Sequence, residues 1–369
     1  MSASGVVVLA AGGTGGHMFP AEALARALLG RGREVALMTD SRGASFGNLP
    51  AVALYRIRAG RVGGNLLRRV MGIASLALGT VEAARKLRAL GPAAVVGFGG
   101  YPSVPTMLAA ARQRLPTVIH EQNAILGRAN RLLAPRVQRI ATSFAEVGAM
   151  RPQDRTRANL TGNPVRPAIA ALRQRPYGAP DPDGAFELLV LGGSQGARIL
   201  SEVVPAALAR LDPALRQRLR LSQQARAEDL EAVRASHAAS GIAAEVKPFF
   251  DDVPARLGRA HLVLARSGAS TVAELTVSGR PAILVPYRYA ADDHQTANAG
   301  ALEAAGAAWV IPEGAFTADA LAEQLALLMR SPELLRETAA RAFALGRPDA
   351  ADRLADLVLA TASAAEALP

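Results

Sequence analysis

Two glycine-rich loops contain the residue types that bind phosphate groups. The first is GGTGGH at residues 12–17, and the second is GGSQGAR at residues 192–198. Glycine lets the backbone approach a ligand closely, so the N–H groups of a following helix can face an anion. Because one loop lies in each half of the chain, the pattern predicts two phosphate-binding loops. The competing interpretation is that the glycines only close two strand-to-helix turns.

The elements around these loops are typical of a parallel α/β sheet. Residues 6–9 and 188–191 are continuous apolar runs of the kind that buried parallel strands show, and Pro20 opens a helical pattern after the first loop. Ligands of such sheets bind at the carboxyl ends of the strands. Both loops therefore follow a strand at the end where a site is expected.

Strand-like and helix-like segments alternate along the whole chain, which predicts an α/β fold of two doubly wound, Rossmann-like domains facing a central cleft. We expect the first domain at 1–166, the second at 167–346, and a C-terminal helical segment at 347–369 that returns to the first domain. The apolar runs that indicate strands are 6–11, 35–39, 52–57, 94–98, 117–120 and 137–142, then 187–191, 243–247, 262–265, 282–286 and 308–311.

The composition of the 369-residue chain excludes several kinds of site. It has no cysteine, so disulfides, thiolate metal sites and cysteine nucleophiles are excluded. The one Asp-x-Asp match, Asp181 and Asp183, lies in a proline-rich loop where we expect turn chemistry and no metal. Since no secretory pattern precedes the first strand, a cytoplasmic protein is expected.

A basic and apolar zone follows the second expected strand. No acidic residue occurs between residues 41 and 81, whereas arginines are frequent there. The net charge of the whole chain is +11. An apolar helix flanked by cations suits the surface of an anionic membrane leaflet, and the alternative is a buried helix with solvated arginines at its ends. The residues expected at the membrane are Leu66, Leu67, Met71, Ile73, Leu76, Arg68 and Arg69.

Other partners and chemistries fit the sequence less well. Nucleic acid is not expected, because only 4% of the residues are aromatic and no helix-turn-helix signature occurs. A dinucleotide-dependent oxidoreductase stays open, since Asp40 ends the second strand, but neither loop has the usual G-x-G-x-x-G spacing. Neither loop carries the Walker lysine that an ATPase needs.

Beyond the two loops, short motifs resemble one known family in type and in order. They are residues 12–17, 99–103 (GGYPS), 120–123 (HEQN), 161–166 (TGNPVR), 192–198, 266–271 (RSGAST), Glu274 and 293–295 (DHQ). The chain is similar over its whole length to the MurG family, peptidoglycan glycosyltransferases of glycosyltransferase family 28. These enzymes move N-acetylglucosamine (GlcNAc) from UDP-GlcNAc to undecaprenyl-diphosphate-linked N-acetylmuramyl-pentapeptide, called lipid I, and so form lipid II.

The resemblance implies a GT-B glycosyltransferase that inverts the anomeric centre and uses no cofactor. Its partners would be UDP-GlcNAc, lipid I, an anionic membrane surface and other cell-wall synthesis proteins. Such an enzyme would lie peripherally on the cytoplasmic face of the bacterial inner membrane. The first domain would hold the acceptor, with Tyr101 on that side, and the second would hold the nucleotide sugar.

The resemblance also implies which residues bind the donor. Ser194 and nearby N–H groups would bind phosphate, Phe250 would border the uracil, Glu274 would bind ribose hydroxyls and Gln295 would reach the GlcNAc hydroxyls. Some family members have two consecutive glutamines where this chain has His294 and Gln295. The full donor set is Thr14, Gly15, Gly16, Asn123, Arg166, Ser194, Phe250, Thr271, Glu274 and Gln295.

Two residues compete for the role of the general base. His17 ends the first loop, and a neutral imidazole can take a proton from an acceptor hydroxyl near pH 7. Glu121 is its rival. The alternatives are that His17 caps the helix or bonds phosphate, and that His120 and Glu121 are structural groups at a strand end. Helix N-termini and Arg166 could stabilise the departing UDP without metal. The alternatives that remain are another UDP-sugar-dependent GT-B transferase and a nucleotide-sugar epimerase.

Overall fold

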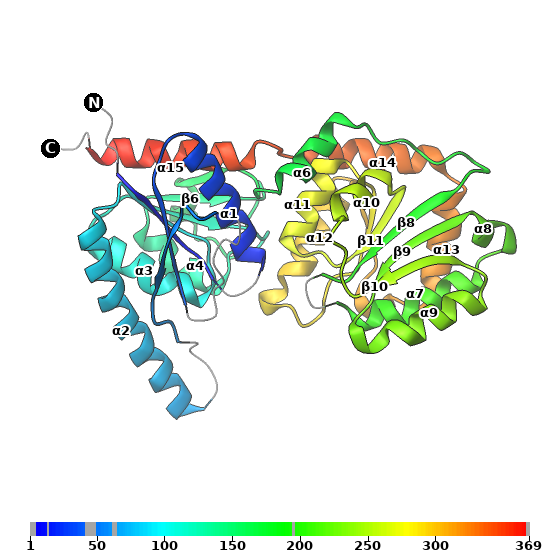
Figure 1. The fold of residues 1–369 in the computed structure, drawn as a ribbon, viewed down its shortest axis with the longest axis horizontal. Helices are drawn as coiled ribbons and strands as arrows, with labels where there is room; N and C mark the ends of the chain where they lie inside the picture. The colour runs from blue at the N-terminus through cyan, green and yellow to red at the C-terminus, as the bar shows by residue number, and fades with distance from the viewer. Residues whose placement is uncertain (1–4, 13–14, 41–48, 61–64, 194–195, 367–369) are drawn as a thin grey trace. The chain divides into compact units, whose positions relative to one another are not determined.

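The computed structural model describes residues 5–12, 15–40, 49–60, 65–193 and 196–366, without the side chains of Leu66, Leu67, Arg68 and Glu366 or the surroundings of Gly15. Its internal contacts divide the chain into two compact units (Figure 1). The first unit is Met1–Arg166 together with Asp349–Pro369, and the second is Pro167–Pro348. Each unit is a parallel sheet covered by helices on both faces, which confirms the predicted pair of doubly wound domains.

The sheet of the first unit has the strand order β3-β2-β1-β4-β5-β6-β7, and its described pairings are parallel. Its strands are β1 (Val7–Ala10), β2 (Val35–Thr39), β3 (Ala53–Arg56), β4 (Ala94–Gly97), β5 (Thr117–Glu121), β6 (Arg139–Thr142) and β7 (Ala158–Leu160). Its helices are α1 (Gly15–Gly30), α2 (Leu66–Leu90), α3 (Gly100–Arg112), α4 (Arg128–Leu133), α5 (Pro152–Arg155) and α15 (Ala350–Glu366).

The sheet of the second unit has the order β10-β9-β8-β11-β12-β13. Its strands are β8 (Phe186–Leu191), β9 (Leu219–Gln224), β10 (Ala243–Lys247), β11 (Leu262–Ala265), β12 (Ala282–Leu284) and β13 (Trp309–Val310). Its helices are α6 (Pro167–Ala170), α7 (Arg198–Arg210), α8 (Pro213–Arg218), α9 (Leu230–Ala239), α10 (Val253–Arg259), α11 (Ala269–Ser278), α12 (His294–Ala304), α13 (Ala318–Met329) and α14 (Pro332–Leu345).

In both sheets the order of strand addition reverses at the first strand. The strands that directly follow β1 and β8 in sequence lie on one side of it, and the later strands lie on the other side. A ligand of a doubly wound sheet binds at this switch point, beyond the carboxyl end of the strand. The two glycine-rich loops follow β1 and β8. The topology therefore places each loop at the ligand-binding edge of its own sheet.

The strands of the first unit send alternate side chains to two separate cores. Val7 and Leu9 of β1 pack with α1 and α15 on one face, whereas Val8 and Ala10 pack with α2 and α3 on the other. All four side chains are completely buried. Burial on both faces explains why these strands are continuous apolar runs in the sequence.

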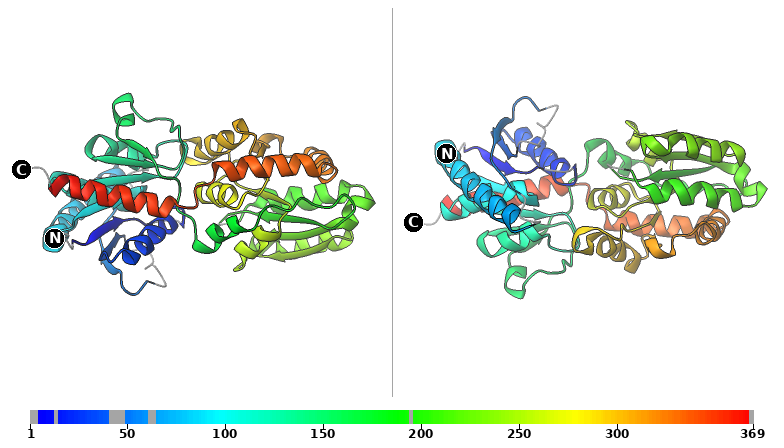
Figure 2. Two further views of the ribbon diagram at one scale, coloured as in Figure 1. Left: turned by 90° about the horizontal axis from the view of Figure 1, so that it is seen from above. Right: turned by 90° about the horizontal axis from the view of Figure 1, so that it is seen from below.

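The C-terminal helix α15 belongs to the first unit. It packs against α1 and against β4, β5 and β6, and Figure 2 shows it running along that unit. Leu354, Ala355 and Val358 are buried in the core beside α1. Arg31, which follows α1, forms ion pairs of 3.0 Å with Asp352 and 2.6 Å with Asp356.

Two strands lie outside the apolar runs of the sequence. β7 is short and only half-buried, and β9 has the sequence LRLSQQ. Gln223 and Gln224 of β9 are buried, and both are hydrogen-bonded: Gln223 Nε2 donates to Leu200 O, and Gln224 Oε1 accepts from Gly192 N. Satisfied amides can occupy a sheet interior without the apolar signal that marks its neighbours.

Candidate functional site

His17 lies in the first turn of α1 and packs against bare backbone from the loop after β4. A methyl group placed on Gly99 would lie 3.5 Å from His17 Cε1, and one on Gly100 would lie 3.4 Å from Nε2. Both glycines have a positive φ, 82° and 69°. The backbone at Gly99, with ψ of −173°, adopts a conformation that is essentially confined to glycine. The GGYPS motif thus supplies a glycine surface for the imidazole.

Glu121 is the last residue of β5, only 2% exposed, and its carboxylate is fully engaged. Oε1 accepts hydrogen bonds from Asn123 N at 3.0 Å and Asn123 Nδ2 at 3.1 Å. Oε2 accepts from Gly127 N at 2.9 Å and from Asn130 Nδ2 at 2.8 Å. Four donors around a buried carboxylate fix the 122–130 loop and leave it poorly placed to take a proton from a substrate.

His120 is buried and held as one neutral tautomer. Its Nε2 lies 3.0 Å from Gly162 O, which can only accept, so Nε2 carries the hydrogen. Its Nδ1 lies 3.0 Å from the amide nitrogen of Gln122, which donates to it. Burial lowers the pKa of His120 to about 4, with a smaller lowering from nearby His17. His120 therefore links β5 to Gly162, which agrees with the alternative that it is a structural group at the end of a strand.

The exposure of most of the other predicted residues of the first unit is known. Tyr101, Asn123 and Arg166 are half-buried, and Gly16 is exposed. Thr14 lies outside the described residues. Gly15 begins α1, but its surroundings are not described.

The second glycine-rich loop is a tight turn between β8 and α7. Gly193 and Gly196 have φ of 81° and 70°, and Gly196 N donates to Gly193 O at 3.1 Å. Gln224 clamps the loop by accepting from Gly192 N and donating to Gly193 O. Helix α7 then begins at Arg198 with neither a side-chain cap nor an acid in its first turn. Ser194 lies outside the described residues.

Gln295 is half-buried at the start of α12, and its side chain is oriented by the β12–α12 loop. Its Oε1 accepts from Tyr287 N at 3.0 Å, and its carbonyl accepts from Ser267 Oγ at 2.8 Å. The contact with Tyr287 N orients the amide, whose NH2 group can act as a hydrogen-bond donor to a ligand. Next to it, His294 Nδ1 donates to Ala291 O at 2.7 Å.

Helix α11 carries the predicted residues Thr271 and Glu274, both half-buried. Ser270, beside them in its first turn, has a buried Oγ without a hydrogen-bond partner among the described residues. A buried hydroxyl without a partner at the ligand edge of a sheet marks a place where a ligand could bond. In the sequence Ser270 was visible only as a member of the motif at residues 266–271, because a hydroxyl without a partner is evident only from tertiary packing.

Phe250 was expected to border the uracil. Its ring is only 3% exposed, and the Arg256 guanidinium lies over it at 4.0 Å from the centroid. The ring is therefore part of the interior and cannot stack on a base, so a ligand could meet this residue only at its backbone. The exposed aromatic residue is its neighbour Phe249, at 63%.

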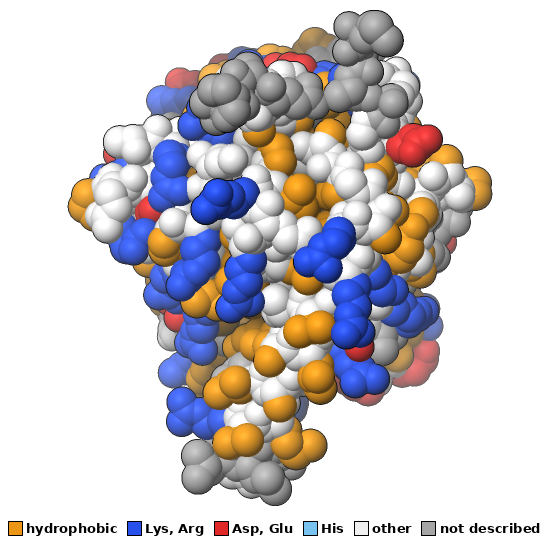
Figure 3. Space-filling model, turned by 90° about the vertical axis from the view of Figure 1, so that its left-hand side faces the viewer, with side chains coloured by type: hydrophobic (Ala, Val, Ile, Leu, Met, Phe, Trp, Pro, Cys, Tyr) orange, Lys and Arg blue, Asp and Glu red, His pale blue; other side chains and the backbone are white. Residues whose placement is uncertain are grey.

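Helix α2 exposes two of the apolar residues that the sequence predicted for a membrane surface, Met71 and Ile73, together with three others. Met71 is 62% exposed and Ile73 is 58% exposed, as are Val70, Leu78 and Val81 to about the same degree. Figure 3 shows these hydrophobic side chains gathered on a protruding face with Lys and Arg on either side. This exposure contradicts the alternative of a buried helix. We call Val70, Met71, Ile73, Leu78 and Val81 the α2 face.

Three details correct or limit that prediction. Leu76 is half-buried and packs against the core of the first unit, so only part of its side chain is open to a membrane surface. Arg69 is exposed as expected. Leu66, Leu67 and Arg68 lie in α2, but their side chains are outside the described set.

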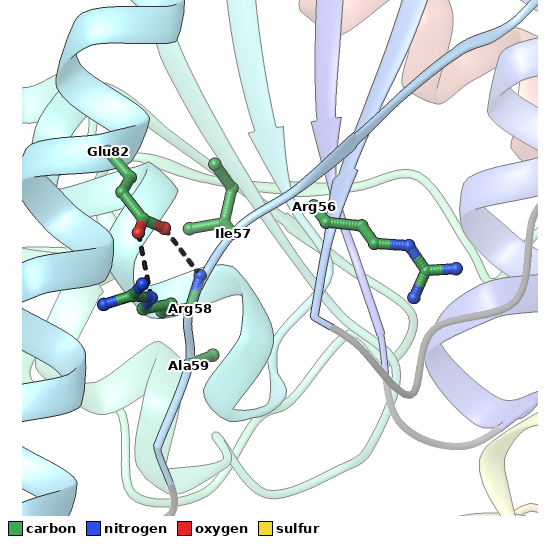
Figure 4. A pocket seen from close by; sticks show the side chains of 5 residues that line it. All are labelled: Arg56, Ile57, Arg58, Ala59 and Glu82. Atoms are coloured by element: carbon green, nitrogen blue, oxygen red, sulfur yellow. Dashed lines mark hydrogen bonds and ion pairs between the residues drawn. The ribbon is translucent and has the colours of Figure 1, made fainter.

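The loop after β3 is fastened to the side of α2. Arg58 pairs with Glu82 of α2, with 3.1 Å between Nε and Oε1, and Arg58 N donates to Glu82 Oε2. A hollow of about 300 Å³ lies here, lined by Arg56, Ile57, Arg58, Ala59 and Glu82. In Figure 4 Arg58 and Glu82 face each other, whereas Arg56 points away. The loop thus adds cations beside the α2 face.

In the part of the chain that the structure describes, no helix is both long and apolar enough to cross a membrane. Within the same ranges, no three histidine or acidic side chains gather closely enough to hold a metal ion.

Comparisons with known proteins identify what this arrangement resembles. Residues 7–142 match the glycosyltransferase family 28 N-terminal domain, and residues 187–354 match the glycosyltransferase family 28 C-terminal domain. A relative from Rhodospirillum centenum is 58% identical over 96% of this chain and 94% of its own length, and one from Paramagnetospirillum magneticum is 58% identical over 96% of both. Both are named UDP-N-acetylglucosamine–N-acetylmuramyl-(pentapeptide) pyrophosphoryl-undecaprenol N-acetylglucosamine transferase. The crystal structure of Acinetobacter baumannii MurG superposes with a TM-score of 0.80 at 30% identity, covering 96% of this chain and 99% of that one.

Proposed function

This chain belongs to glycosyltransferase family 28, and we propose that it transfers GlcNAc from UDP-GlcNAc to undecaprenyl-diphosphate-linked N-acetylmuramyl-pentapeptide. Its pair of Rossmann-like units is the GT-B architecture. The observation that carries the proposal is the identity of 58% to relatives named for this reaction, over nearly the full length of both chains. The product would be lipid II, an intermediate of peptidoglycan synthesis.

The second unit offers the groups that a nucleotide sugar needs. The uncapped N-terminus of α7 presents N–H groups to the diphosphate, and a helix N-terminus favours an anion by roughly 0.3–1 kcal/mol, up to about 2 when partly buried. Thr271, Glu274 and the unpartnered Ser270 hydroxyl supply polar groups beside it for the ribose and phosphates. The NH2 group of Gln295 donates to a sugar hydroxyl.

The first unit supplies the proton acceptor. His17 takes the proton of the attacking acceptor hydroxyl, the hydroxyl oxygen bonds to the anomeric carbon from the face opposite UDP, and the bond to UDP breaks with its electron pair. The anomeric centre inverts. Glu121 positions the 122–130 loop and leaves the proton transfer to His17, because four donors already occupy its carboxylate. The positive charge of Arg166 and the N–H groups at the start of α7 stabilise the negative charge that develops on UDP.

The α2 face brings the enzyme to its acceptor. A polyprenyl chain is costly to remove from a bilayer, so the enzyme must bind at the membrane surface. We place the exposed apolar residues of α2 in the acyl boundary and the neighbouring cations, Arg58, Arg69 and Arg85, at anionic headgroups. This would make the chain a peripheral protein of the cytoplasmic face of the inner membrane.

An assay of the fate of the sugar tests the reaction against its nearest alternative. Purified chain is incubated with radiolabelled UDP-GlcNAc, EDTA and a short-chain lipid I analogue, and in parallel without the analogue. We expect the label to appear in the analogue even in EDTA, and we expect no conversion of UDP-GlcNAc in the sample without the analogue. Sugar conversion in the sample without acceptor would instead identify a nucleotide-sugar epimerase, and transfer only to a different acceptor would identify another UDP-sugar transferase.

A further inference from the structure

Two residues close to the backbone of Gly99, His17 and Asn130, each have a buried polar atom without a hydrogen-bond partner among the described residues. These atoms are His17 Nδ1 and Asn130 Oδ1. A methyl group on Gly99 would lie 3.5 Å from His17 Cε1, the atom bonded to Nδ1, and 3.6 Å from Asn130 Oδ1. Buried polar atoms ordinarily have partners. Here an amide oxygen that can accept and a ring carbon next to a nitrogen that can donate lie at similar distances from the same point.

The orientation of the Asn130 amide is set by its other contacts. Its Nδ2 donates to His120 O at 3.1 Å and to Glu121 Oε2 at 2.8 Å. Both of these atoms can only accept, so the amide nitrogen must face them and the oxygen must face the other way. Asn130 is 2% exposed, and Gly127 N holds the same carboxylate oxygen. The carboxylate of Glu121 therefore fixes the direction in which Asn130 Oδ1 points.

We propose that Asn130 is a positioning residue for His17, with Asn130 Oδ1 accepting a hydrogen bond from His17 Nδ1–H. This inference rests on the proposed role of His17 as the base. The bond selects the tautomer in which Nε2 is unprotonated and can take the proton of the acceptor hydroxyl. The imidazolium that forms keeps its Nδ1–H on Asn130. Hydrogen bonds of this kind are often open in a free enzyme and close with substrate, which fits two neighbouring unpartnered atoms.

The proposal gives separate roles to four neighbouring residues. Glu121 orients Asn130, Asn130 orients His17, and Gly99 leaves the space between the last two empty. His120 stands outside this series, because its own ring is fixed in the opposite tautomer by Gly162 and Gln122. His120 thus provides an internal reference.

The tautomer can be read directly from nitrogen-15 imidazole spectra of the intact protein with UDP and the short-chain lipid I analogue bound. The chain has five histidines, so the His17 signals can be assigned by comparison with His17→Gln. At about pH 9, where an ordinary imidazole is neutral, we expect His17 with hydrogen on Nδ1 and His120 with hydrogen on Nε2. In Asn130→Ala we expect His17 to become a mixture of tautomers while His120 is unchanged. In Asn298→Ala, a buried asparagine of the second unit, His17 should keep its wild-type signals.

Wild-type protein in which His17 carries its hydrogen on Nε2 would overturn the proposal, even if Asn130→Ala fails to fold. An unchanged His17 spectrum in folded Asn130→Ala would overturn it as well.

Kinetics separate a failure of this proposal from a failure of the proposed function. At saturating UDP-GlcNAc, Asn130→Ala should lower kcat about 10–100-fold, within the contribution of a general base, and leave the donor KM unchanged. In a His17→Ala background the same substitution should lower kcat further by less than about twofold, because both changes act through one group. Losses that multiply would contradict positioning. A fully active His17→Ala would instead contradict the proposed base.

Discussion

At the scale of single residues, the first unit separates the two groups that the sequence had left as competitors. His17 is half-buried against glycine backbone, whereas Glu121 is saturated by four donors. His120, the neighbour of Glu121, is a fixed neutral imidazole. The HEQN segment is therefore a scaffold beside His17. The sequence could propose both competitors, since their types suit proton transfer, but only the hydrogen-bond partners show that the Glu121 carboxylate is already engaged.

Replacing Glu121 tests its role as a scaffold. In Glu121→Gln an NH2 group replaces one of the two carboxylate oxygens. It would face either the donors of Asn123 or those of Gly127 and Asn130, so at least one buried donor would lose its acceptor. We expect a loss of about 1–3 kcal/mol in the free energy of unfolding, measured by urea titration. Glu146→Gln, an exposed position of the same unit, is the matched control and should be neutral. Wild-type stability in Glu121→Gln would show that the carboxylate is not a structural tie.

The buried His120 predicts a dependence of stability on pH. Burial lowers its pKa from 6.5 to about 4, so the unfolded chain binds the proton more tightly than the folded one. Its contribution is complete above about pH 6.5 and is lost as the pH falls through about 4, by about 3 kcal/mol in all.

We therefore expect the stability advantage of wild type over His120→Gln to shrink between pH 7 and about pH 4 in urea titrations. The substitution His294→Gln, which is made in the second unit, should show no such narrowing. A constant difference between wild type and His120→Gln would mean that His120 is not held neutral by the fold.

At the scale of elements, α2 is longer than its core contacts require, and its outer side is apolar. The sequence indicated an apolar helix between arginines but could not decide between core and surface, because apolar periodicity does not say what covers a face. The structure decides it through exposure, because Met71 and Ile73 are exposed whereas Leu76 is half-buried against the core.

A charge on the α2 face tests membrane docking. Met71→Asp combined with Ile73→Asp should lower partition onto anionic phospholipid vesicles by more than about 100-fold, because burying each apolar side chain contributes about 1.5–3 kcal/mol. Sedimentation with vesicles measures it. Leu327→Asp, at a 53% exposed position of α13, is the matched control. Unchanged vesicle binding by the α2 variant would remove the proposed docking face.

Helix α15 allows two kinds of attachment to be compared. Its ion pairs join Arg31 to Asp352 and Asp356, whose side chains are 67% and 71% exposed, and exposed pairs contribute about 0–1 kcal/mol each. Leu354 is fully buried, and such a leucine costs about 2–5 kcal/mol when cut to alanine. Urea titrations should therefore show a larger loss for Leu354→Ala than for Arg31→Ala. The reverse order would mean that the ion pairs hold the helix.

At the scale of the whole molecule, the architecture follows from the pattern of the sequence more directly than the contacts of single side chains do. Alternating apolar runs indicated two doubly wound domains because strands buried on both faces are ordinarily apolar throughout. The same rule missed β9, whose buried Gln223 and Gln224 are satisfied by hydrogen bonds. It also could not show that Phe250 is interior or that Ser270 lacks a partner, since both depend on tertiary packing.

The central claim is acceptor-dependent transfer of GlcNAc to a polyprenyl-diphosphate lipid at a membrane surface. In the most direct test, the full-length protein is incubated with sugar-labelled UDP-GlcNAc and with anionic vesicles that contain full-length lipid I. The label is then measured in the extracted lipid. We predict transfer by wild type and a loss of about 10²–10⁴-fold in His17→Ala, the usual contribution of a general base. Label that stays on the nucleotide, with lipid I present and the protein bound to the vesicles, would contradict the account.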